Sequence, residues 1–170
     1  MTPHVLTVDT EVRDLRTADH LLHTLAAELA LPEGTFGCTH LVRGERPHVA
    51  LSLTLPSEPL LRTAQERLTA RGHEVSPGSP DTVGRAVIYP GVSSLTGTLT
   101  IADVLTHSAI DRVTVLGATG RPSPETRLVT GDHVRPQWQT GELVLTAMPA
   151  VGGTLVPFEV PDPTPCCADH

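Results

Sequence analysis

The chain has 170 residues, of which 39% are hydrophobic, and it carries a formal net charge of -7 at pH 7. This length suffices for one domain or for two small domains packed together, with a core of Leu, Val and Ala because aromatic residues make up only 2%. The negative charge and the scattered arginines exclude the clustered basic face that phosphate binding needs, so we expect no nucleic-acid partner.

The first half of the chain predicts the order strand, helix, strand, strand, helix, strand. The predicted strands cover residues 5–12, 36–43 and 48–55 and an extended piece that begins at His73. The first predicted helix is capped by Thr17, holds Asp19 in its first turn and stops at Gly34. The second is capped by Ser57 and stops at Gly72. This order over residues 1–76 is the β-α-β-β-α-β pattern of a ferredoxin-like half in an α+β fold, with two helices on one face of an antiparallel sheet.

The second half follows a loop, residues 76–82, that is rich in Pro, Gly and Ser and predicts a boundary between the halves. Thr100 is expected to cap a short helix that ends at His107. The predicted extended runs are residues 83–89, 112–116, 127–139, 142–148 and 154–160. We therefore expect residues 83–160 to form a mostly antiparallel β half packed with the first half.

The last ten residues, 161–170, form a Pro-rich tail that reads PDPTPCCADH. Such proline spacing favours an extended conformation, which would present the thiols of Cys166 and Cys167 and the imidazole of His170. Thiolate is a soft ligand that selects ions such as Zn(II) and Cu(I), and imidazole suits both metals. The tail therefore predicts a metal site or, through a strained and easily reduced Cys-Cys disulfide, a redox pair.

A second fragment with ligand side chains is Cys38-Thr39-His40. The period of a strand would place Cys38 and His40 on one face, where they could complete a closed metal site with the tail residues. The alternative for Cys38 is a small, buried core residue, which is the most common environment of a free cysteine.

The basic residues are all arginines, and the chain contains neither lysine nor asparagine. Both missing types have AT-rich codons, so the bias favours a GC-rich genome such as that of an actinobacterium. The absence of lysine excludes Schiff-base chemistry and a Walker P-loop, and no Gly-x-Gly-x-x-Gly motif occurs, so we expect no nucleotide cofactor. Without a targeting signal or an apolar run of about 20 residues, we expect a cytoplasmic protein with no membrane partner.

Two other functions remain open beside metal binding or thiol redox chemistry. One is a small enzyme with a pocket between the two halves, with His133, Arg135, Cys38 and His40 as candidates, because alternation places His133 and Arg135 on one face of a strand. The other is an interaction module whose tail is a docking peptide for a partner protein or a substrate for a modifying enzyme. A non-enzymatic metal-binding or redox protein is the function that we expect.

Overall fold

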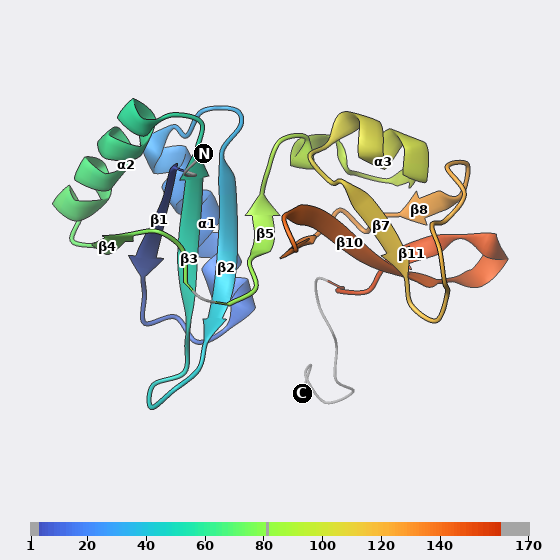
Figure 1. Ribbon diagram of the computed structural model, residues 1–170, viewed down its shortest axis with the longest axis horizontal. Helices are drawn as coiled ribbons and strands as arrows, with labels where there is room; N and C mark the ends of the chain where they lie inside the picture. The colour runs from blue at the N-terminus through green and yellow to red at the C-terminus, as the bar shows by residue number, and fades with distance from the viewer. Residues whose placement is uncertain (1–3, 81, 161–170) are drawn as a thin grey trace, which may run out of the picture. The chain divides into compact units, whose positions relative to one another are not determined.

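The structure is a computed structural model that describes residues 4–80 and 82–160 (Figure 1). It is a mixed α+β fold with three α-helices and eleven strands in these residues, and most strand pairings are antiparallel. The described chain divides into two compact units. The first unit comprises residues up to Pro90 and residues 137–140, and the second comprises residues 91–136 and 141–160.

The first unit is built on a sheet with the strand order β4-β1-β3-β2-β5-β9, in which all neighbours are antiparallel. Its strands are β1 His4–Asp9, β2 Phe36–Val42, β3 His48–Leu55, β4 Glu74–Pro77, β5 Arg85–Ile88 and β9 Gln137–Gln139. Its helices are α1 Leu15–Leu29 and α2 Glu58–Ala70. The predicted β-α-β-β-α-β order of elements in the chain is therefore present.

Both helices of this unit pack on the same face of the sheet. Alternate residues of the strands point to that face and meet the helices there. The shared core contains side chains of β1, β3, β5 and both helices. Its members include Leu6 and Val8 from β1, Leu51 and Leu53 from β3, Leu22 and Leu25 from α1, Ala64 and Leu68 from α2, and Val87 from β5. The apolar stripes of the two helices thus bury the inward side chains of the central strands.

Helix α1 begins earlier than the sequence predicts, and its cap is Asp14 rather than Thr17. The Asp14 Oδ1 atom accepts a hydrogen bond from the Thr17 backbone N–H at 2.8 Å, and the Asp14 Oδ2 atom accepts one from the Thr17 hydroxyl at 2.8 Å. The bond from the Thr17 backbone lowers the pKa of the Asp14 carboxyl. Thr17 was misidentified because Asp, Ser and Thr are all good caps and both positions precede the apolar stripe.

The chain between β4 and β5 crosses the face of the sheet that the helices leave uncovered (Figure 1). At the start of the crossing, the Gly78 carbonyl accepts a hydrogen bond from the Thr7 hydroxyl of β1 at 2.7 Å. Farther along, the Thr82 carbonyl lies 3.3 Å from the His40 Nδ1 atom of β2. We call residues 78–80 and 82–84 the crossing segment, and it buries the polar side chains beneath it.

The second unit contains one helix, α3 Ile101–His107, and a mixed arrangement of strands. Its strands are β6 Thr98–Thr100, β7 Arg112–Val115, β8 Arg127–Val129, β10 Glu142–Pro149 and β11 Leu155–Pro157. Strand β10 pairs in parallel with β7 and antiparallel with β11, and β8 pairs in parallel with β11 and antiparallel with β6. The predicted cap of α3 is confirmed, since the Thr100 hydroxyl accepts from the Asp103 N–H at 3.1 Å.

One prediction for this part of the chain was wrong, and one strand was missed. The long extended run predicted over 127–139 is broken, because only Arg127–Val129 and Gln137–Gln139 are strands within it. Strand β6 was not predicted, since three residues are too few to show a period of two.

No helix within residues 4–80 and 82–160 is long and apolar enough to span a bilayer.

Candidate functional site

The tail residues predicted to bind a metal, Cys166, Cys167 and His170, lie outside the described residues. Within the described ranges, no group of three or more His, Cys, Asp or Glu side chains is arranged to hold a metal ion. The structure does place Cys38 and His40, and it reveals a groove in the first unit that the sequence analysis did not predict.

Cys38 and His40 lie on the same face of β2, as the strand period predicts, and both are buried beneath the crossing segment. In the β2–β3 register Cys38 is opposite Ser52 and His40 is opposite Ala50. A Cβ atom built on Gly84 would lie 3.2 Å from the His40 Cε1 atom and 3.6 Å from the Cys38 Cβ atom. The backbone of Gly84 therefore closes over both side chains.

The ring of His40 is held by two hydrogen bonds that fix its tautomer. Its Nε2 atom lies 2.7 Å from the Ser52 hydroxyl oxygen, and its Nδ1 atom lies 3.3 Å from the Thr82 carbonyl oxygen. Because a carbonyl oxygen can only accept, the proton is on Nδ1, and Nε2 accepts from the hydroxyl of Ser52. Burial lowers the pKa of the His40 imidazole, so the fold favours the neutral ring.

The thiol of Cys38 is held in its protonated form. Burial raises the pKa of the Cys38 thiol to about 11, although contacts with Trp138 and Ser52 act in the opposite direction. The thiolate is both the metal ligand and the nucleophile of cysteine chemistry. Cys38 therefore sits as an inert thiol in the folded first unit.

His133 and Arg135, two of the candidates for the enzyme, lie in the second unit between β8 and β9, outside the strand predicted for them, and a carboxylate contacts the histidine. The His133 Nε2 atom lies 2.7 Å from the Glu159 Oε2 atom, and the side chain of His133 is largely buried. The Arg135 Nη1 atom donates to the Val134 carbonyl oxygen at 3.5 Å. In the folded chain the carboxylate of Glu159 therefore occupies the place beside His133 that an anionic ligand would take.

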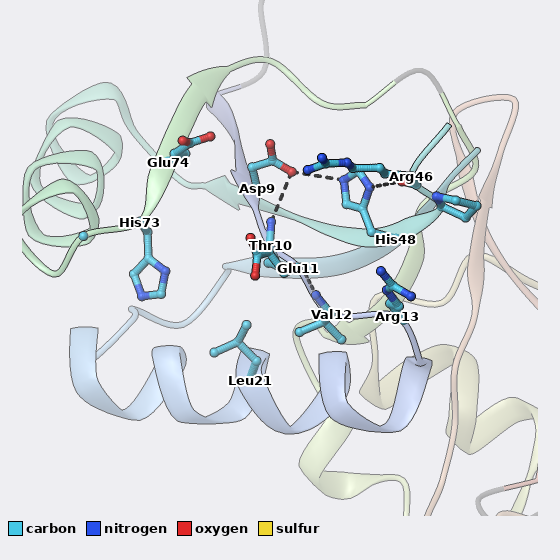
Figure 2. Close-up of a pocket in the computed structure, with 12 residues that line it drawn as sticks. Asp9, Thr10, Glu11, Val12, Arg13, Leu21, Arg46, His48, His73 and Glu74 are labelled. Atoms are coloured by element: carbon cyan, nitrogen blue, oxygen red, sulfur yellow. Dashed lines mark hydrogen bonds and ion pairs between the residues drawn. The ribbon is translucent and has the colours of Figure 1, made fainter. Parts of the chain in front are cut away.

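The groove in the first unit has a volume of about 1090 Å³ and is open to solvent (Figure 2). Three segments that are distant in the sequence form its walls, namely the end of β1 with the loop that follows, the turn before β3, and the turn before β4, and helix α1 adds Leu21. The residues that line it are Asp9, Thr10, Glu11, Val12, Arg13, Leu21, Arg46, Pro47, His48, Gly72, His73 and Glu74. We call it the β1-end groove.

Hydrogen bonds hold the β1-end groove in shape. The Thr10 hydroxyl donates to the Val49 carbonyl oxygen and accepts from the Val12 N–H at 3.1 Å, and the Val49 N–H donates to the Val12 carbonyl oxygen at 2.7 Å. The loop after β1 is therefore tied to β3 through its backbone. A groove built on such fixed segments is largely formed before a ligand arrives.

His48 connects two parts of the groove wall. Its Nε2 atom lies 3.1 Å from the Asp9 Oδ1 atom, and its Nδ1 atom lies 2.9 Å from the Arg46 carbonyl oxygen. Both partners are acceptors, and each of the two ring nitrogens faces one of them. This arrangement presents a carboxylate and an imidazole that already satisfy each other.

Sequence reasoning missed this groove because its charged residues come from separate turns. Asp9, Glu11 and Arg13 alternate along the end of β1, which reads as an ordinary solvated strand end. No local signal identified the groove, because it forms only where β1 pairs with both β3 and β4, which brings the turns before those strands beside it. No protein-family model, curated protein or solved structure matches the chain.

Proposed function

We propose that the protein binds a soft metal ion, Zn(II) or Cu(I), or carries out thiol redox chemistry through Cys166, Cys167 and His170. The observation that supports this proposal is the seclusion of Cys38, whose thiol is buried and has a pKa raised to about 11. The chain has three cysteines. Because Cys38 is secluded, the adjacent pair in the tail would carry any metal or redox chemistry at thiols. The α+β units would then be the scaffold that carries the tail.

The chemistry of the tail follows from its spacing. Adjacent cysteines do not chelate one tetrahedral ion without strain, but two thiolates suit a two-coordinate soft ion or a site that another ligand completes. His170, four residues after Cys166, would be that auxiliary ligand. A site that also used Cys38 and His40 would require the crossing segment to leave the sheet, because Gly84 closes over both side chains.

We also propose that the N-terminal part of the chain is a ferredoxin-like half, that the two halves and tail form separate parts of the chain, and that the protein is cytoplasmic. The strand order β4-β1-β3-β2 and the two helices on one face support the first point. Strands β5 and β9 extend that sheet beyond the four strands of the simple pattern. A reducing cytoplasm would keep the tail thiols available as ligands.

The test is to purify the full chain under reducing, chelator-free conditions and to measure bound metals by mass spectrometry. The variant that combines Cys166→Ser with Cys167→Ser is compared with the matched control Cys38→Ala. We expect near-stoichiometric zinc or copper in the wild-type chain and in Cys38→Ala, and loss of the metal in the tail variant. Metal in the tail variant equal to that of the wild type would contradict the assignment.

The redox form of the proposal is tested on the same samples by titration with glutathione buffers. Formation and reduction of a Cys166–Cys167 disulfide, measured by alkylation and mass spectrometry, should occur within the range of the cytoplasmic thiol pool. A chain that binds neither added Zn(II) nor Cu(I) and forms no such disulfide would refute both forms. The tail would then be better explained as a docking peptide for a partner protein.

A further inference from the structure

We propose that the β1-end groove binds a small zwitterion of the amino-acid type, with a carboxylate and an ammonium group on a short apolar frame. This inference goes beyond the tail chemistry and uses none of the tail residues. It rests on the groups of both charges that line the groove, on its apolar floor, and on the pre-formed backbone. Each of these features comes from the described residues of the first unit.

The side of the groove next to β3 carries the positive charge. Arg13 follows β1, and Arg46 precedes β3; in the view of Figure 2 the side chain of Arg46 extends past His48 toward Asp9. In the part of the chain that the structure describes, no hydrogen bond or ion pair engages the guanidinium of Arg13 or that of Arg46. A planar guanidinium donates to carboxylates through two parallel N–H groups, so this side fits the carboxylate of a ligand.

The side of the groove next to β4 carries the negative charge. Glu74 of β4 is directly opposite Asp9 of β1 in the antiparallel register, and Glu11 follows on the same chain segment. Like charges that face each other across two strands repel, and His48 contacts only the Asp9 carboxylate of this pair. An ammonium group placed between Glu74 and Asp9 would relieve this repulsion, so this side fits the amine of a ligand.

The floor between the two charged sides is apolar. Leu21 of α1 and Val12 line it, and both side chains are partly buried against the core of the unit. Figure 2 shows Leu21 below the carboxylates and Val12 below the histidine. A ligand with an apolar side chain would cover these two residues while its charged ends reach the two walls.

Simpler ligands fit this groove less well. An anion without an amine, such as phosphate, would face the three carboxylates of Asp9, Glu11 and Glu74. A cation without a carboxylate would face Arg13 and Arg46 instead. A zwitterion matches both walls at once, because complementary charges favour the correct ligand and repel the others.

The test is a solution NMR titration of the isotopically labelled full chain with L-leucine and with L-leucyl-L-leucine. Two further probes each keep half of leucine: 4-methylpentanoate lacks the ammonium group, and 3-methylbutylamine lacks the carboxylate. We expect saturable shifts of the amide signals of Glu11, His48 and Glu74 with a zwitterion, and binding of each half-ligand at least about tenfold weaker. Absence of saturable shifts with both zwitterions, or equal binding of one half-ligand, would overturn the proposal.

Two variants locate the two ends of the ligand. Arg46→Gln should weaken the zwitterion and 4-methylpentanoate, whereas Glu74→Gln should weaken the zwitterion and 3-methylbutylamine. Arg62→Gln is the matched control, because Arg62 is an exposed arginine of α2 that does not line the groove. The tail variant with Cys166→Ser and Cys167→Ser should bind the zwitterion unchanged, and loss of binding there would contradict a site in the groove.

Discussion

Arg85 of β5 and Asp19 of α1 form a buried two-point ion pair that joins the sheet of the first unit to its helix layer. The Arg85 Nη1 atom lies 2.6 Å from the Asp19 Oδ1 atom, and the Nη2 atom lies 3.0 Å from the Oδ2 atom. The Nη1 atom also donates to the Thr39 hydroxyl at 3.2 Å. Both ionic groups are buried, with side-chain exposures of 8% and 11%.

Removal of one partner of this pair should be costly. In Asp19→Ala the guanidinium of Arg85 remains buried without its carboxylate, and we expect a loss of about 3–5 kcal/mol in the free energy of unfolding. Urea unfolding followed by circular dichroism measures the change. Arg62→Ala, which breaks the exposed pair of Arg62 with Glu58, should cost less than about 1 kcal/mol. Equal losses in the two variants would show that burial does not strengthen the Asp19–Arg85 pair.

Apolar replacement of the whole pair gives a sharper outcome. The double variant Asp19→Leu with Arg85→Met leaves no charge in the core and should recover most of the loss seen in Asp19→Ala. A double variant as unstable as the single one would indicate that the hydrogen bonds of Arg85, including the one to Thr39, supply the stability instead.

The thiol of Cys38 should react slowly in the folded chain. The pKa of this thiol is raised by burial from an ordinary value of 9.0 to about 11, so near pH 8 the thiolate fraction falls about 100-fold. Alkylation with iodoacetamide in a variant whose other cysteines are changed to serine measures the rate. We expect labelling in urea at the normal rate of a free thiol and labelling of the folded chain at least about 100-fold slower. Rapid labelling without denaturant would show that the crossing segment opens readily.

Acid should destabilise the first unit through His40. Burial lowers the pKa of this imidazole below its ordinary value of 6.5, so the unfolded chain takes up the proton more readily than the folded chain. The stability that the neutral ring supports is complete above pH 6.5 and is lost as the pH falls through the lowered pKa of the folded state. Urea unfolding between neutral pH and about pH 5 measures this loss.

His40→Gln is the control for this pH dependence, because glutamine offers a hydrogen bond to Ser52 and does not titrate. The variant should be less stable at neutral pH and should lose less stability than the wild type on acidification. The same slope in both proteins would assign the acid sensitivity to other groups.

Gly91 should tolerate no side chain. Its φ angle is +85°, and a Cβ atom there would overlap the carbonyl oxygen of His107 within the second unit. We expect Gly91→Ala to cost roughly 1–2 kcal/mol for the left-handed backbone and about 1–3 kcal/mol more for the overlap. Gly97→Ala is the matched control, because Gly97 has a φ angle of +63° and nothing within 4 Å of the added atom. Thermal unfolding of both variants separates strain from overlap.

Local sequence patterns predicted the elements whose signals lie within a few residues. Strand β3 has the predicted bounds His48–Leu55, because its apolar and small residues alternate along its whole length. Helix α3 has the predicted cap at Thr100, because the cap and its partner Asp103 are only three residues apart. Propensity and period are sufficient in such places.

The sequence could not predict contacts that depend on distant segments. Asp19 was expected in the first turn of a helix, and nothing nearby in the sequence indicated its burial, because its partner Arg85 comes from a strand 66 positions later in the chain. The partner of His40, Ser52, required the register of β2 against β3, and its cover required the path of the crossing segment. The β1-end groove likewise joins three turns that no local pattern connects.

The crossing segment also constrains the order in which the first unit can assemble. Its contacts with Thr7 on β1 and with His40 on β2 span the central strands, so these contacts cannot form until those strands are side by side. Strand β5 comes directly after the segment and pairs with β2. The two contacts together require the β1-β3-β2 part of the sheet, so we expect the docking of β5 to follow the pairing of these strands during folding.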